Sequence, residues 1–277
     1  MARALRAPKL PVKLKIPRLP KTDEPYEDVF EEMTLAEHLL ELRDRVVRAV
    51  IAVVLALIVG VIFAGQLFRE IAIKANVLVS GEPGSGLDIS KPTDSITIWF
   101  KIALYIAIAI AMPVLVYQFI AFLSPGLTRK EKRILFSCLP FVTALFVGGM
   151  AYGFFFAAPR AFDFLSNFQA GAISWDPDAQ EVVNFFLTLM IGLGLAFQLP
   201  VIMFMLAKLN IVSPERMRAY RRFSYLGILI VAAIITPSTD PINMAIVAIP
   251  LLLLYEVGIL LARVFVKTGV GGQPAAA

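Results

Sequence analysis

The segment Thr34-Leu-Ala-Glu-His-Leu-Leu-Glu-Leu-Arg-Asp-Arg45 leads directly into the first long apolar run of the chain, Val46–Gly65. Thr34 followed three residues later by Glu37 is a capping box, which predicts that a helix begins here. The apolar run has about the 20 residues that a helix needs to cross the hydrocarbon core of a bilayer. The stretch therefore predicts an amphipathic helix that continues into a membrane span.

The carboxylates of this first helix have two interpretations. Glu37, Glu41 and Arg45 follow one another at four-residue steps on one face. A helix that lies in the membrane interface would hold Glu41 at the membrane surface, where it can pair with arginines of a ligand. Alternatively, this is a surface helix whose Glu and Arg side chains pair with each other. These residues alone leave both interpretations open.

The composition indicates a membrane protein. Hydrophobic residues make up 58% of the chain, and the mean hydropathy is +0.78, well above the values of soluble domains. The apolar runs predict an all-α, polytopic protein with six transmembrane helices. The predicted spans are Val46–Gly65, Ile96–Leu123, Ile134–Ala158, Val182–Ala207, Phe223–Ile235 and Ile242–Ala262.

The basic residues predict the orientation, because cytoplasmic loops carry an excess of Lys and Arg. With the amino terminus inside, the cytoplasmic loops contain Arg129, Lys130, Lys132, Arg133, Lys208, Arg216, Arg218, Arg221 and Arg222. The outward loops contain only Arg69, Lys74, Lys91 and Arg160. Both termini are therefore expected in the cytoplasm, and the net charge of +5 is attributed to topology and anionic lipid rather than to nucleic acid.

The two ends of the chain are predicted to lie outside the membrane domain. Residues 1–32 are charged and rich in proline, which predicts a disordered cytoplasmic arm without a cleavable signal peptide. Residues 33–266 form the six-span domain, and residues 267–277 form a flexible cytoplasmic tail.

The sequence offers little catalytic chemistry. The single His38 has no Ser or Cys motif beside it, and the single Cys138 lies in an apolar span. Gly-rich phosphate loops, His-Glu-x-x-His and Cys-x-x-Cys do not occur in the sequence. We therefore expect a protein that is not an enzyme and that has neither a cofactor nor a metal site.

A few polar residues fall at membrane depth, where an ionisable or polar group is a functional candidate by default. Gln198 lies within the fourth span, Lys101 begins the second, and Asp240 closes the turn before the sixth. Gln198 could instead make an interhelical hydrogen bond that only holds the bundle together. Lys101 and Glu256, which lies in the sixth span, could extend to an interface.

The fifth predicted span is short. Phe223–Ile235 offers only about 20 Å of helix against a hydrocarbon core of roughly 30 Å. Short spans are accommodated by local thinning of the bilayer. Pro250 is expected to interrupt the sixth helix.

Two motifs give the chain a resemblance to a known family. Glu37-His-Leu-Leu-Glu-Leu-Arg-Asp-Arg45 resembles the amino-terminal signature of TatC, the core receptor subunit of the twin-arginine protein translocase. Phe122-Leu-Ser-Pro-Gly-Leu-Thr-Arg-Lys-Glu-Lys-Arg133 is similar to that family's first cytoplasmic loop. The resemblance covers about residues 33–262. Further similarity occurs at Lys101 with Pro113, Pro159, Phe197-Gln-Leu-Pro200, Thr236-Pro237 with Asp240, and Leu254-Tyr-Glu256.

The resemblance implies a curved, cup-like fold of six helices in the cytoplasmic (inner) membrane, which binds the signal peptides of folded proteins and is driven by the proton-motive force. It implies that paired arginines of the signal peptide meet Glu41 and Glu131, beside a patch shaped by Phe122, Pro125 and Leu127. Implied partners are TatA- and TatB-type single-span proteins, further copies of the chain and the bilayer, but not nucleic acid.

The chain departs from common family residues at two positions. Gln198 stands where many relatives have Glu, so this chain lacks a titratable group there, and Met244 stands where relatives often have Gln. The alternative function, which belongs to a different class, is that of a secondary transporter or channel for small solutes. That function would require a continuous polar pathway with titratable groups.

Overall fold

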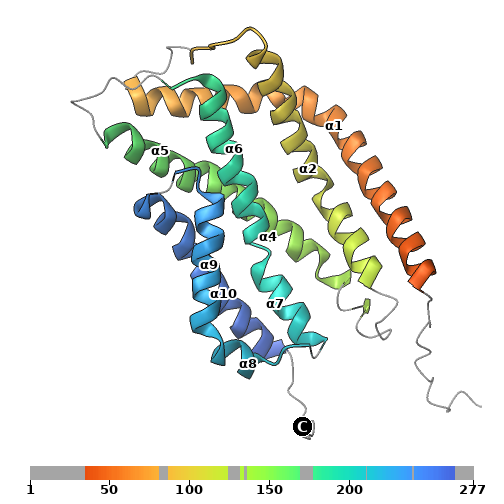
Figure 1. Cartoon of the computed structure of the whole chain (residues 1–277). Coiled ribbons are helices and arrows are strands. Elements are labelled where there is room, and N and C mark those ends of the chain that lie inside the picture. The colour runs from red at the N-terminus through yellow and green to blue at the C-terminus, as the bar shows by residue number, and fades with distance from the viewer. Residues whose placement is uncertain are drawn as a thin grey trace, which may run out of the picture.

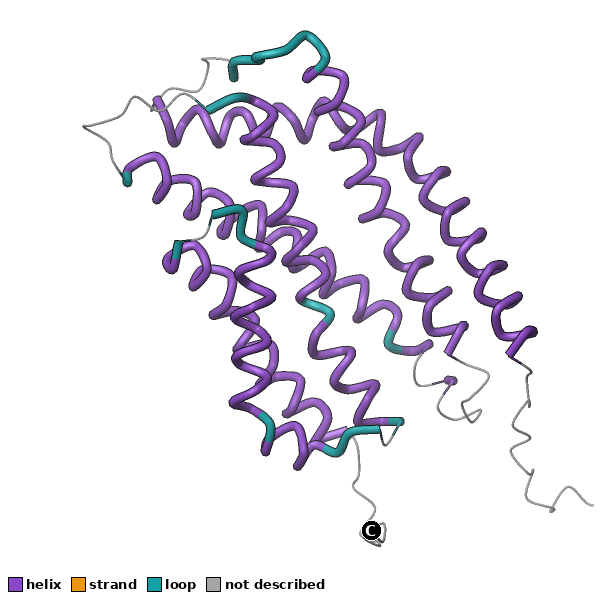
Figure 2. Tube along the Cα trace, viewed as in Figure 1, coloured by secondary structure: helices purple, strands orange, loops and turns teal. Residues whose placement is uncertain are grey.

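The computed structural model describes residues 35–80, 87–123, 132–133, 136–168, 177–209, 211–238 and 240–265. Within these ranges the regular structure is entirely helical (Figures 1 and 2). The other residues, which include all of the predicted amino-terminal arm, 1–32, and of the predicted carboxyl-terminal tail, 267–277, lie outside the described part of the chain. The prediction of an all-α protein is confirmed.

The first helix is longer than predicted. Helix α1 runs over Leu35–Ser80, so the amphipathic segment and the first span form one element. Residues 66–80, predicted as part of an outward loop, continue the helix because Ile71 and Ala75 recur at helical spacing and are fully buried. In Figure 1 α1 changes direction part-way along, and its carboxyl-terminal part crosses the top of the view.

Helix α2, Asp94–Leu123, packs antiparallel along α1. A seam of small residues allows the two backbones to approach closely, since a Cβ atom on Gly60 would lie 2.2 Å from the Ala103 carbonyl oxygen. Small residues recur every four positions on both helices and are all buried. They are Ala56, Gly60 and Ala64 on α1, and Ala103, Ala107 and Ala111 on α2.

The third apolar run forms one long rod that contains an irregularity. Helix α4, Leu139–Tyr152, continues through the π-helical turn η2, Gly153–Ala157, into α5, Ala158–Asn167. The Ala158 N–H donates to the Gly153 carbonyl five residues back, and the next residue, Pro159, has no N–H to donate. The predicted span ending at Ala158 is therefore too short by about nine residues.

The fourth run is divided in two. Helix α6, Ala179–Ala196, stops and α7, Leu199–Lys208, begins after a turn at Phe197 and Gln198, a break that is visible in Figure 2. Pro200 lacks the N–H that would bond the Ala196 carbonyl, which favours this interruption. The predicted span, Val182–Ala207, lies within the single apolar segment Ala179–Lys208 that is long enough to cross a bilayer, but the helix inside it is interrupted.

The last elements are α8, Pro214–Ala219, α9, Arg221–Ile235, and α10, Pro241–Phe265. Helix α9 has 15 residues and is short, as predicted. Helix α10 continues through Pro250, contrary to prediction. Pro250 cannot bond the Ile246 carbonyl, but the Tyr152 hydroxyl of α4 donates to that oxygen over 3.2 Å and so satisfies the acceptor.

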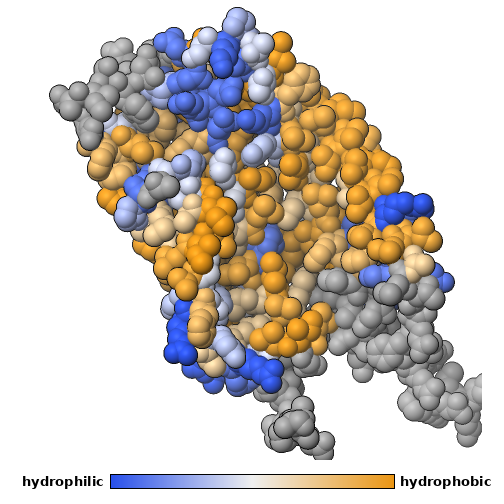
Figure 3. All heavy atoms as spheres, in the orientation of Figure 1, coloured by the Kyte–Doolittle hydropathy of each residue, from blue (hydrophilic) through white to orange (hydrophobic). Residues whose placement is uncertain are grey.

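The arrangement is that of a membrane protein. Among the described residues, five helical segments are long and apolar enough to cross a bilayer, and α9 is shorter than these. Apolar atoms cover the middle of the face shown in Figure 3, and hydrophilic atoms gather at its two ends. The five segments are Ala36–Leu78, Asp94–Phe122, Leu139–Asn167, Ala179–Lys208 and Pro241–Val264.

Candidate functional site

The carboxylate of Glu41 lies at the beginning of α1 and uses its two oxygens differently. Oε1 accepts hydrogen bonds from Arg45, from Nε over 2.8 Å and from Nη2 at closer range. Oε2 is buried and has no hydrogen-bond partner among the described residues, and His38 Nδ1 lies 3.9 Å from it. The pairing of Glu41 with Arg45, which was one of the two interpretations of this helix, is therefore present, and it leaves one carboxylate oxygen free to accept.

Phe122 connects this carboxylate to the end of α2. The ring of His38 stacks on the ring of Phe122, with centroids 4.3 Å apart and planes inclined by 19°. The structure thus places two of the predicted site residues, Glu41 and Phe122, on either side of one imidazole. Sequence analysis found no partner for His38, although its position three residues before Glu41 on a helix was a usable signal.

The other predicted signal-peptide residues, Glu131, Pro125 and Leu127, lie outside the described residues. The chain is described again at Lys132 and Arg133, directly after them.

Gln198 occupies the break between α6 and α7, where it is 8% exposed. Its Nε2 donates to the Val142 carbonyl of α4 over 3.0 Å. Its Oε1 is buried and has no hydrogen-bond partner within the part of the chain that the structure describes. The amide therefore makes an interhelical hydrogen bond and also presents one acceptor that this bond does not use.

Lys101 bonds within the bundle. Its Nζ donates to the Asn184 side-chain oxygen of α6 over 2.7 Å, and the side chain is half-buried. This hydrogen bond gives Lys101 a partner on another helix, and the alternative in which Lys101 extends to an interface stays a prediction. Sequence analysis did not identify Asn184 as the partner.

Asp240 caps the amino terminus of α10. Its carboxylate accepts from the Asn243 N–H over 2.7 Å and from Asn243 Nδ2 over 2.8 Å. Burial acts to raise the pKa of Asp240, but hydrogen bonds from Asn243 and with Ser238 outweigh it, and the pKa lies below its ordinary value. These bonds are those of a structural cap.

Glu256 is held by two side chains of α9. Arg221 Nη2 lies 2.5 Å from Glu256 Oε2, and the Tyr225 hydroxyl donates to Oε1 over 2.6 Å. The neighbouring Tyr255 donates to the Met217 carbonyl of α8 over 2.8 Å. Sequence analysis named Glu256 without a partner, because the pairing depends on how α9 lies beside α10.

In the described part of the chain, Gln198, Lys101 and Asp240 each make local interactions with different partners and do not form one cluster. No group of three or more His, Cys, Asp or Glu among the described residues could hold a metal ion. The fold and these polar positions define a multi-pass helical membrane protein. At one end of its first two helices, Glu41 of α1 and Phe122 of α2 both lie close to the ring of His38.

The comparisons with known proteins identify the family. Residues 37–250 match the model of the family described as Sec-independent protein translocase protein (TatC), so the chain belongs to the TatC family. A TatC of Deinococcus radiodurans is 34% identical over 235 residues, which are 83% of this chain and 86% of the relative. TatCy of Bacillus subtilis is 32% identical over 240 residues, which are 84% and 89% of the two chains.

The fold has solved counterparts as well. A crystal structure described as the twin arginine translocase receptor TatC superposes with a TM-score of 0.71 at 31% identity. The match covers 83% of this chain and all of that one. The resemblance stated from the sequence is confirmed, and with it the assignment to the core of the twin-arginine translocase.

Proposed function

We propose that this chain receives twin-arginine signal peptides at the cytoplasmic face and scaffolds assembly of the translocase around them. The supporting observation is the Glu41 carboxylate, whose buried Oε2 has no partner and lies beside the stacked rings of His38 and Phe122. A carboxylate accepts several hydrogen bonds, so the bond with Arg45 leaves capacity for a guanidinium of the peptide.

The chemistry of the Glu41 carboxylate suits arginine. A hydrogen bond to a charged group is worth about 1.5–3 kcal/mol, and the planar fork of arginine fits carboxylate oxygens better than the single ammonium of lysine does. Arg45 orients the carboxylate by holding Oε1. Glu131 would supply the second carboxylate for the second arginine, on the strength of the family resemblance.

The proposal includes a topology. Helix α9 would be the fifth of six spans, with both termini in the cytoplasm and the protein in the inner membrane as a cup of helices. The basic residues of the two cytoplasmic loops support this orientation. About 22 Å of helix in α9 would require a thinned bilayer beside it.

The proposed partners are TatA- and TatB-type single-span proteins, with transport driven by the proton-motive force. The unpaired Oε1 of Gln198 would accept a hydrogen bond from a polar residue of such a helix. Because Gln198 does not titrate, it would dock a partner rather than relay protons. Lys101 and Asp240 would position helices rather than contact the partner, since each is engaged within the chain.

The test is the affinity of a fluorescent twin-arginine signal peptide for the full chain in nanodiscs, measured by anisotropy. We expect Glu41→Gln to weaken binding about tenfold, the equivalent of 1.4 kcal/mol, and Glu41→Gln with Glu131→Gln nearly to abolish it. Asp44→Asn is the matched control, because Asp44 is an exposed carboxylate on the same helix, paired with Arg43 over 2.8 Å.

A twin-lysine peptide completes the experiment, since it should bind the unaltered chain weakly and lose little more on Glu41→Gln. Unchanged affinity in the folded double variant would refute the proposed recognition site. An equal loss of peptide affinity in Asp44→Asn would mean that Glu41 acts only through a general effect of negative charge. Uptake of small solutes by proteoliposomes containing this chain alone would favour the transporter instead.

A further inference from the structure

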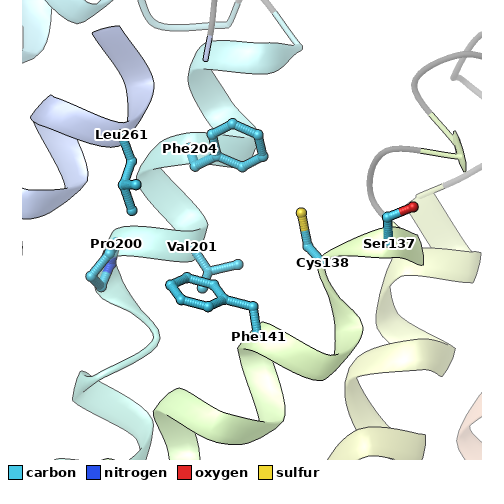
Figure 4. A pocket seen from close by; sticks show the side chains of 7 residues that line it. All are labelled: Ser137, Cys138, Phe141, Pro200, Val201, Phe204 and Leu261. Carbon is cyan, nitrogen blue, oxygen red and sulfur yellow. The ribbon is translucent and has the colours of Figure 1, made fainter. Parts of the chain in front are cut away.

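A groove opens between three helices, away from the Glu41 site. It has a volume of about 320 Å³ and is formed by residues of α7, α10 and the beginning of α4. Figure 4 shows Cys138 and Phe141 on one wall, facing residues of α7, with Leu261 of α10 beyond them. The lining residues are Ser137, Cys138, Phe141, Pro200, Val201, Phe204 and Leu261.

The size and chemistry of the groove restrict its occupant. The lining is apolar except for the Ser137 hydroxyl, which donates to the Arg133 carbonyl, and the Cys138 thiol. A helix with its side chains has a diameter of about 10–12 Å, which is too large for this space. A single hydrocarbon chain fits, because sites for small ligands begin at roughly 300 Å³.

Two stripes of side chains continue from the groove to a cation. On one wall Phe141 follows Ser137 by four residues, and the Ser137 hydroxyl donates to the Arg133 carbonyl over 2.8 Å. On the other wall Phe204 and Lys208 lie one turn apart on α7. Both cations occur at helix ends that the charge distribution assigns to the cytoplasm, and among the described residues neither forms a salt bridge.

We propose that this groove binds one acyl chain of an anionic phospholipid, whose phosphate is held by Arg133 and Lys208. Basic pockets between transmembrane helices on the cytoplasmic side are suited to anionic headgroups. Arg133, whose carbonyl accepts from the lining residue Ser137, and Lys208, one turn beyond the lining residue Phe204, would select a net negative headgroup, and the apolar walls would retain its tail. The lipid would thereby link α4 to α7 on the cytoplasmic side of the Gln198 break.

Native mass spectrometry of the full chain in detergent tests this proposal. Phosphatidylglycerol and phosphatidylcholine with the same acyl chains are titrated separately. We expect one phosphatidylglycerol molecule to be retained in preference to phosphatidylcholine. Each of Arg133→Gln and Lys208→Gln should lower that preference about fivefold, as for 1 kcal/mol per basic residue near a membrane surface.

Two matched pairs of variants make the result specific. Arg218→Gln with Arg222→Gln removes two exposed cytoplasmic cations elsewhere and should leave the preference unchanged. Cys138→Trp fills the groove and should abolish retention of both lipids, whereas Val147→Trp adds the same bulk at an exposed position of α4 and should not. Thermal unfolding of each variant confirms that it remains folded.

Equal retention of the two lipids by the unaltered chain would overturn the proposal, as would an equal effect of the Arg218 and Arg222 changes. Retention that survives Cys138→Trp would place the lipid elsewhere. If Cys138→Trp weakened signal-peptide affinity while sparing lipid retention, the groove would belong to the peptide. A dimer that dissociates on Cys138→Trp would assign the groove to a second copy of the chain.

Discussion

The α1–α2 pair and the α9–α10 pair are joined by different kinds of contact. Helices α1 and α2 meet along a seam of small residues, where Gly60 approaches the backbone of Ala103. Helix α9 buries only Ile228 and Ala232 and is joined to α10 by the Arg221–Glu256 ion pair and the Tyr225 hydroxyl.

The difference follows from helix length and from the solvent. Lipid provides little hydrophobic drive for helix association, so helices are held by close packing or by polar contacts. Long helices can repeat a small residue at every turn and accumulate packing contacts. A helix of 15 residues offers few such turns, and polar contacts near its amino-terminal end, at Arg221 and Tyr225, contribute instead. The first pair should therefore be sensitive to volume and the second to charge.

The largest effect is expected from volume added to the α1–α2 seam. Gly60→Ala places a Cβ atom 2.2 Å from the Ala103 carbonyl oxygen, so the helices must separate. Overpacking of this kind costs about 1–3 kcal/mol, partly offset by the higher helix propensity of alanine. Thermal unfolding in detergent should show a clear fall in the midpoint.

Gly148→Ala provides a control of opposite sign. Gly148 lies in α4, and nothing lies within 4 Å of a Cβ atom added there. Alanine should therefore leave the midpoint unchanged or raise it, by up to about 1 kcal/mol of propensity. Similar midpoints for the two variants would show that the seam is not closely packed.

The same contrast explains what could be predicted from the sequence. Apolar length alone was sufficient for the helical class and for the shortness of α9. The Glu41–Arg45 pair was readable because its spacing is that of one helix turn. Contacts between helices, such as Lys101 with Asn184, depend on which helices are neighbours, and spacing along one chain does not contain that information.

The errors at helix boundaries have the same origin. The sequence predicts a break at Pro250, yet α10 continues because the Tyr152 hydroxyl from another helix bonds the carbonyl that the proline leaves unpaired. At Pro200 the break is real, and Gln198 fills it by bonding the Val142 carbonyl. Pro113 likewise lies inside the continuous helix α2, so a proline in the sequence alone does not predict an interrupted helix.

An intermediate effect is expected from removal of charge between α9 and α10. Glu256→Gln abolishes the ion pair with Arg221 but keeps an acceptor for Tyr225. Because both side chains are more than a third exposed, the cost should be about 1 kcal/mol or less. Hydrogen exchange should accelerate in α9 and remain unchanged in α2.

Arg222→Gln is the matched control for this pair. Arg222 is the exposed neighbour of Arg221 and stacks on Phe223 within α9, so its loss should not alter exchange in α9. Equal acceleration in both variants would mean that the overall charge of the helix end, and not the Glu256 contact, holds α9 in place.

The smallest effect on stability is expected at Gln198, which belongs to neither pair. Gln198→Leu removes one interhelical hydrogen bond, worth below about 1 kcal/mol in membranes, together with a buried acceptor that has no partner. The midpoint of unfolding should therefore hardly change. If the free Oε1 docks a partner helix, copurification of TatA- or TatB-type proteins should nevertheless fall, while signal-peptide affinity is retained.

Gln118→Leu is the control, because Gln118 on α2 also has a buried Oε1 without a partner among the described residues and should not affect copurification. Gln198→Glu keeps an acceptor at the same position and should preserve partner recovery. Full recovery of partners with Gln198→Leu would leave the amide with the single role of holding α7 to α4, and the site of partner docking would then have to lie on another helix.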